Sequence, residues 1–75
     1  MIFETLSELS RIIREERKKQ GLTQIEAAVL CRVGTRFLSD LENAKKTIHF
    51  GKVLQVLKGL GLQLSVEVKS KDETT

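Results

Sequence analysis

The stretch from Leu22 to Lys45, LTQIEAAVLCRVGTRFLSDLENAK, constrains the fold of this 75-residue chain more than any other feature. It opens with a capping box, in which the Thr23 hydroxyl can accept a backbone N–H while the Glu26 carboxylate accepts the N–H of Thr23. Apolar residues then recur at helical spacing on one side: Ile25, Ala28 and Val29. The pattern therefore predicts a short helix that begins at a defined residue.

A tight turn and a second short helix follow. The helical pattern breaks at residues 31–34, where a single apolar residue, Val33, lies between polar or small ones. It resumes with Phe37, Leu38 and Leu41 facing inward, and the intervening outer positions are polar. Two helices joined by so few residues must pack at a steep angle, which is the geometry of a helix-turn-helix motif.

Two further helices flank this pair. The first is predicted from about Leu6 to Gln20, with Thr5 and Glu8 as a second capping box and Gly21 as its end. The other is predicted over residues 48–60, with Thr47 as its N-cap and the glycines at 59 and 61 as stop signals.

After Gly61 the apolar period changes from 3.6 to 2, which predicts a strand with one apolar face over residues 62–69. No second stretch of the sequence alternates in this way, and a strand without a partner leaves backbone groups and apolar surface unsatisfied. We expect a homodimer in which the strand pairs antiparallel with its symmetry mate. A short segment folded back on its own domain is the alternative. The expected interface residues are Leu62, Leu64, Val66 and Val68.

Length and composition limit the protein to one small domain. A core in a chain this short rarely stabilises the fold by more than a few kcal/mol, so oligomerisation is expected. The longest apolar runs fall far short of the roughly 18 residues of a membrane span, and the N-terminus lacks the features of a signal peptide. We therefore expect a cytoplasmic protein with residues 1–61 as one domain, residues 62–69 as a dimerisation strand, and residues 70–75 as a disordered tail.

Charge is distributed unevenly along the chain. Residues 22–61 carry six basic against three acidic residues, which accounts for the whole net charge of +3. The pI of about 9.3 is typical of nucleic-acid-binding domains, although a mildly basic surface is common in itself. Double-stranded DNA is therefore a candidate partner.

Catalytic function finds no support in the sequence. There is no nucleophile with a nearby base, no metal-ligand spacing and no glycine-rich phosphate loop, so neither an enzyme nor a cofactor is expected. Cys31 is the only cysteine and cannot form an internal disulfide. A buried, reduced thiol is the simple interpretation, and a redox switch is the alternative.

The chain resembles a known family, the XRE-type helix-turn-helix proteins, which include phage repressors, Cro proteins and HipB-like antitoxins. The resemblance covers roughly residues 6–61, and the run GKVLQVLKGLGLQLSV over residues 51–66 is most similar to the HipB-like branch. Two positions depart from the family, because Arg32 and Ala44 stand where it usually has glycine. The matching residues are Gly21, Leu22, Thr23, Gln24, Ala28, Val33, Leu38 and the closing run from Leu41 to Lys45, within which Ala44 is the departure just named.

The resemblance implies an all-α, lambda-repressor-like helix-turn-helix domain with a C-terminal β-strand that pairs across a homodimer. It also implies a transcriptional repressor that binds a palindromic operator, and within the HipB-like branch an antitoxin that binds a HipA-type kinase toxin and represses its own operon. A competing hypothesis keeps the fold but not DNA binding, leaving a protein-interaction module.

Candidate DNA contacts divide by position. Arg36 can donate two hydrogen bonds to guanine, and a solvated or phosphate-bound arginine is the alternative. Asp40 is expected to orient Arg36 or to accept from a cytosine amino group. The resemblance places a phosphate contact at Gln24, and a helix N-terminus suits anions. The expected base contacts are Thr35, Arg36, Ser39 and Asp40; the expected phosphate contacts are Thr23, Gln24, Asn43, Lys45 and Lys46, each of which could instead cap a helix or solvate a loop.

Arg17 and Glu42 match family positions that join the first and third helices in a buried ion pair, and exposed surface charges are the alternative. Ile2 and Phe3 precede the first helix. They could cover the core or contribute to a partner surface, and the sequence does not decide between these roles.

Overall fold

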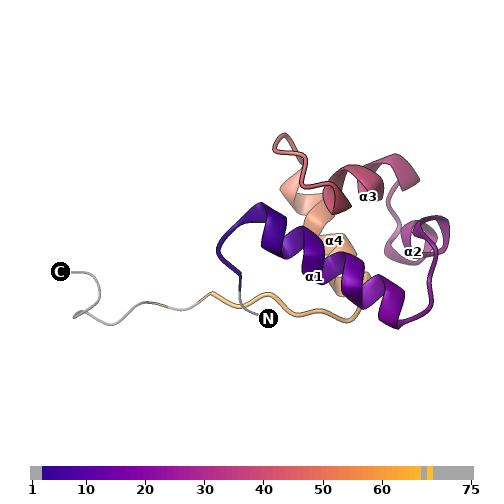
Figure 1. Cartoon of the computed structure of the whole chain (residues 1–75), viewed down its shortest axis with the longest axis horizontal. Helices are drawn as coiled ribbons and strands as arrows, with labels where there is room; N and C mark the ends of the chain where they lie inside the picture. Colours follow the sequence, from indigo (N-terminus) through magenta and orange to yellow (C-terminus); the bar gives the residue numbers. More distant parts are fainter. Residues whose placement is uncertain (1–2, 67, 69–75) are drawn as a thin grey trace.

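Four helices in the order α1, α2, α3 and α4 make up the computed structural model, which describes residues 3–66 and 68 (Figure 1). Helix α1 packs against α3, and α2 packs against both α3 and α4. No helix of the described residues is long and apolar enough to cross a membrane. The helices are α1 (Leu6–Lys19), α2 (Gln24–Cys31), α3 (Thr35–Glu42) and α4 (Phe50–Gly59).

Helix α1 begins where the sequence predicts. The Thr5 hydroxyl accepts the backbone N–H of Glu8, which satisfies one of the free donors of the first turn. Gly21 follows the helix with a positive φ of 73°, which glycine adopts without a steric penalty. The buried side of α1 combines Leu9 and Ile13 with the polar Ser10, whose hydroxyl donates to the carbonyl of Leu41 in α3.

Helix α4 is shorter than predicted. Thr47 was expected to cap a helix over residues 48–60, but the N-cap is His49, whose Nδ1 accepts the backbone N–H of Lys52 at 3.3 Å. Gly59, predicted as a stop signal, is itself the last residue of the helix, and Leu60 is the C-cap. A Cβ at Gly59 would come within 2.9 Å of the Cα of Cys31, so the glycine is required by the close approach of α2 and α4.

The core lies between the four helices, and it divides the apolar side predicted from Ile25, Ala28 and Val29, of which only Ala28 is buried. Ile25 and Val29 are exposed, whereas the small residues Ala27 and Ala28 and the thiol of Cys31 are buried. Small side chains on this face let α2 lie close to α4. The buried apolar residues are Leu9, Ile13, Ala27, Ala28, Cys31, Leu38, Leu41, Val53, Val56, Leu57 and Leu60.

The predicted C-terminal strand is absent from residues 62–66 and 68 of the single chain, so this prediction was wrong for the isolated protomer. The physical reason is that strand hydrogen bonds need a neighbouring strand, and the described part of the chain provides none. Leu62 and Leu64 still pack against the core, while Val66 and Val68 are almost fully exposed. The tail predicted over residues 70–75 lies outside the described residues, as does Ile2.

Candidate DNA interface

Helix α3 separates its apolar and polar residues cleanly. Leu38 and Leu41 are fully buried, and Phe37 is partly buried beside them with the Lys52 ammonium 5.7 Å from its ring centre. On the outer side, Thr35 and Arg36 in the first turn are exposed, and Ser39 and Asp40 are partly exposed. The helix therefore presents an open polar face with an arginine at its N-terminal end.

A buried ion pair fixes α3 to α1. The Nε of Arg17 donates to one Glu42 carboxylate oxygen at 2.7 Å, and its Nη2 donates to the other at 3.0 Å. The remaining guanidinium nitrogen donates to the backbone carbonyl of Leu22 at 2.8 Å. Only 10% of the arginine side chain and 3% of the glutamate side chain are accessible to solvent. This bidentate geometry holds both charges in one orientation and so limits rotation of α3.

The predicted phosphate contact Gln24 extends the same network. Its side-chain amide donates to Glu42 at 3.1 Å, so this amide bridges the start of α2 to the end of α3. The Gln24 side chain is therefore bonded within the fold. The groups near Gln24 that suit a phosphate are the backbone N–H groups at the start of α2, because a helix N-terminus favours anions.

Asp40 does not orient Arg36, contrary to the prediction from their four-residue spacing. Its carboxylate lies 3.5 Å from the ammonium of Lys45, in the loop after α3. Lys45 is accordingly neutralised in part and Arg36 has no ion pair among the described residues. The Asp40 carboxylate is thus directed toward the end of α3, away from Arg36 in its first turn.

Two other predicted phosphate contacts also have partners inside the fold. Thr23 and Glu26 form the complete capping box, with distances of 3.1 and 2.9 Å, and the Thr23 N–H lowers the pKa of the Glu26 carboxyl by stabilising its charged form. Asn43 donates to the Ser39 hydroxyl at 3.5 Å. Lys46 is exposed and forms no ion pair within the described residues.

Both helices of the motif end in a left-handed residue that is not glycine. Arg32 after α2 has φ 59°, and Ala44 after α3 has φ 57°. Arg32 and Ala44 stand where the family resemblance leads us to expect glycine. Both turns still form, but they are strained, because a Cβ in this conformation crowds the following carbonyl.

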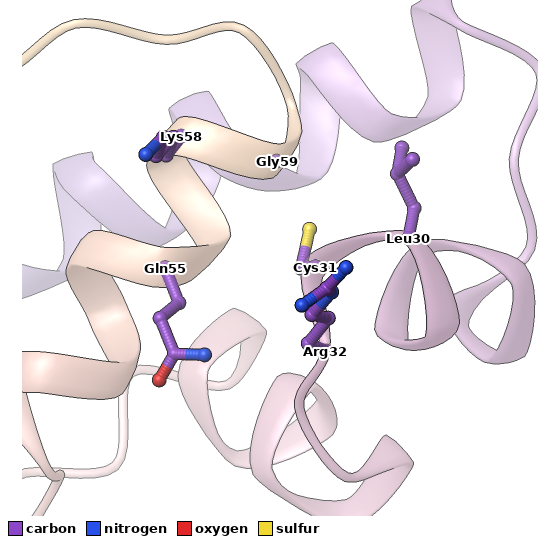
Figure 2. A pocket seen from close by; sticks show the side chains of 6 residues that line it. All are labelled: Leu30, Cys31, Arg32, Gln55, Lys58 and Gly59. Carbon is purple, nitrogen blue, oxygen red and sulfur yellow. The ribbon is translucent and has the colours of Figure 1, made fainter.

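Sequence reasoning missed one cleft (Figure 2). It lies between the end of α2 and the last turns of α4, has a volume of about 420 Å³, and carries two cations, Arg32 and Lys58. The available signal was that the stretch from residue 24 to residue 31 is apolar on nearly all sides, whereas a surface helix has a single apolar stripe. The lining residues are Leu30, Cys31, Arg32, Gln55, Lys58 and Gly59.

Comparison with known proteins agrees with this geometry. The helix-turn-helix family model matches residues 13–66. The uncharacterized HTH-type transcriptional regulator y4mF of Sinorhizobium fredii (strain NBRC 101917 / NGR234) is 44% identical over 62 residues, which cover 83% of this chain and 82% of that protein.

Solved structures share the fold. HipB in a HipA-HipB-O2-O3 complex superposes with a TM-score of 0.82 at 18% identity, covering 93% of this chain and 99% of that chain. The HipB-O4 20mer complex gives the same values. A restriction-modification controller protein has a TM-score of 0.69 at 25% identity, covering 84% of this chain and 80% of that chain. The chain therefore belongs to the XRE-type helix-turn-helix family of transcriptional regulators and has a HipB-like fold.

Proposed function

We propose that this protein is a dimeric, sequence-specific DNA-binding repressor whose recognition helix is α3. The observation that carries the proposal is the polar outer face of α3, which is held against α1 by the buried pair of Arg17 and Glu42. A helix that reads bases must keep its orientation when it meets DNA, and an ion pair with two hydrogen bonds provides that rigidity.

Base reading is assigned to the first turn of α3. Arg36 is exposed there and can donate two parallel hydrogen bonds to guanine O6 and N7, while the neighbouring Thr35 can contact a base or a thymine methyl group. Ser39 and Asp40 lie one turn further along the same face. Lys46 and the N-terminus of α2 then meet phosphates on either side, with Lys45 partly neutralised by Asp40.

Dimerisation is proposed through the segment after α4. An apolar groove of about 220 Å³ opens between the start of α1 and α4, with Phe3, Leu6 and Phe50 among its lining residues and Leu64 at one side. The neighbouring Val66 and Val68 are exposed in the single chain and have little to bury them. Antiparallel pairing of two such segments would place apolar residues over both grooves and satisfy the backbone groups of each strand.

A two-fold dimer suits operator recognition. One short helix reaches only a few base pairs, whereas two copies related by a dyad read half-sites about 34 Å apart on one face of the duplex. The fold likeness to HipB, whose solved complexes carry DNA and HipA, supports a further proposal that this chain is the antitoxin of a HipA-type kinase and represses its own operon.

The DNA proposal is tested with the duplex upstream of the protein's own gene and a scrambled duplex of equal length. We expect tight binding to the former, with a logarithmic affinity that falls linearly with the logarithm of salt concentration, as phosphate contacts require. No binding of either duplex at low salt would favour the alternative, an interaction module that has lost DNA binding.

The dimer proposal is tested with Leu64→Asp, which places a charge on the apolar side of the segment. Sedimentation should show monomers at concentrations where the parent is a dimer, and operator binding should weaken because the two half-sites are no longer linked. Gln63→Asp adds the same charge at an exposed neighbouring position and should remain dimeric. A fully dimeric Leu64→Asp variant would place the dimer interface elsewhere.

A further inference from the structure

The outer face of α2 is apolar apart from the Glu26 carboxylate, and nothing in the described chain covers it. Ile25, Val29 and Leu30 expose 65%, 75% and 51% of their surface. The opposite side of the same helix carries Ala27, Ala28 and Cys31, so α2 is apolar nearly all round. A helix of this kind is normally buried on both sides, which indicates that a partner covers the outer face.

This apolar face leads directly into the basic cleft. Leu30 belongs to both, since it also lines the cleft of about 420 Å³ on the α2 side, where Arg32 lies, while Lys58 lies across the cleft on α4 (Figure 2). The lining residues include two cations and the Gln55 amide but no carboxylate. Neither cation forms an ion pair within residues 3–66 and 68. A carboxylate in the cleft would therefore gain two favourable charge interactions.

The combination of surfaces selects the class of partner. DNA is a poor match for the part of α2 beyond its first turn, because Val29 and Leu30 offer a phosphate backbone neither a hydrogen-bond donor nor a positive charge. A second copy bound through the proposed dimer segment is also a poor match. Figure 1 shows α2 at one end of the domain, while that segment runs from the end of α4 past the start of α1, away from α2.

We propose that the outer face of α2 and the adjoining basic cleft form the docking site for a protein segment that presents aliphatic side chains beside a carboxylate. We assign that segment to the HipA-type kinase, and this assignment rests on the proposed function. The aliphatic residues pack on Val29 and Leu30, and the carboxylate binds between Arg32 and Lys58. Docking at this face leaves the outer side of α3 open, so kinase and operator can be bound together.

The sharpest test compares two substitutions that relieve the same backbone strain. Arg32→Gly removes the cleft cation and a strained left-handed residue together, whereas Ala44→Gly relieves the same strain at the end of α3, away from the cleft. By isothermal titration calorimetry with the purified HipA-type kinase that the proposed function assigns to this chain, Arg32→Gly should weaken binding about tenfold, as expected for loss of a close charge pair. Ala44→Gly should bind as the parent does.

This comparison separates docking from folding, because Arg32→Gly should melt no lower than the parent. A more stable variant that binds the kinase less tightly cannot owe its loss to unfolding.

A second pair is matched by position, since Lys58 and Lys18 both lie in the last turn of a helix. Lys58→Gln should weaken kinase binding severalfold, and Lys18→Gln should not change it.

The apolar part is tested with Val29→Ser and Leu30→Ser, which remove only exposed side chains. Each should weaken kinase binding about tenfold, as for a buried interface anchor, and leave operator affinity unchanged. Parent-like kinase binding by these variants and by Arg32→Gly would overturn the docking site while keeping the kinase as partner. A parent protein that does not bind the kinase would overturn both, and operator affinity that falls with the docking variants would assign the face to DNA.

Discussion

Helices α2 and α3 have the same length and form the two halves of one motif, yet their outer faces are opposite in character. The outer face of α3 is polar and carries Arg36, while that of α2 is mainly aliphatic and carries Val29. Their attachments differ as well. Helix α3 is held to α1 by a buried charge pair, and α2 is held to α4 by close packing of small residues.

Under the proposed function, this difference keeps two surfaces of a very small domain for separate partners. A base-reading helix needs a fixed orientation, which directional hydrogen bonds provide. A protein-docking helix needs apolar area, which can be left exposed only if the inner face of the helix is secured without using large side chains. Ala27, Ala28 and Gly59 meet that condition, because they allow α2 and α4 to approach closely.

The largest expected effect comes from breaking the attachment of α3. Glu42→Gln leaves the guanidinium of Arg17 buried without a counter-charge, which should lower the free energy of unfolding by about 3 kcal/mol or more. The control is Glu15→Gln, because Glu15 pairs with Arg11 at 3.6 Å on an exposed surface, and this change should cost less than about 1 kcal/mol. Equal melting temperatures for the two variants would mean that the buried pair contributes no more than an exposed one.

A smaller loss is expected on the side of α2. Gly59→Ala places a Cβ against the backbone of Cys31, so α2 and α4 must separate, at an expected cost of about 1–3 kcal/mol in unfolding free energy. Gly51→Ala in the same helix is the control. Its nearest neighbours are atoms of the exposed His49 ring, which can move, so the alanine should be tolerated far better. Thermal denaturation of both variants measures the difference.

The motif and the starts of α1 and α2 could be predicted from the sequence because capping residues and apolar spacing act locally. Thr5 and Thr23 mark the starts of α1 and α2 through hydrogen bonds that span only three residues. The resemblance to the XRE family also brought Arg17 and Glu42 together across 25 positions, which no local pattern provides.

What could not be predicted depends on contacts between distant residues. The helical spacing of Ile25 and Val29 does not tell which side of α2 meets α4, because both sides are apolar. Asp40 has one arginine four residues before it and one lysine five residues after it, and only the turn at Ala44 brings the lysine close. The strand predicted over residues 62–69 is absent from residues 62–66 and 68, because pairing needs a neighbouring strand that the described residues do not supply.

The outer face of α3 can be tested for base reading against charge attraction. Arg36→Ala should weaken operator binding by about 1–3 kcal/mol and relax discrimination at one base position per half-site. Lys46→Ala should weaken binding to all duplexes alike and lower the salt slope by about one unit per half-site. Fluorescence anisotropy with operator and scrambled duplexes over a salt series distinguishes them. Equal losses on both duplexes for Arg36→Ala would make it a phosphate contact.

The smallest expected effect concerns a feature that the two helices share. Arg32 and Ala44 each end a helix in the left-handed region, where a Cβ costs about 1–2 kcal/mol. Glycine removes that cost but loses more backbone entropy on folding, which opposes the gain by about 0.5–1 kcal/mol. Arg32→Gly and Ala44→Gly should therefore each stabilise the fold by about 0.5–1 kcal/mol, and the double variant by nearly the sum, because the two turns lie at separate helix ends. Thermal denaturation provides the measurement. A loss of stability at Arg32 alone would mean that its side chain makes contacts worth more than the strain, and α2 would then be secured by its cap as well as by its packing on α4.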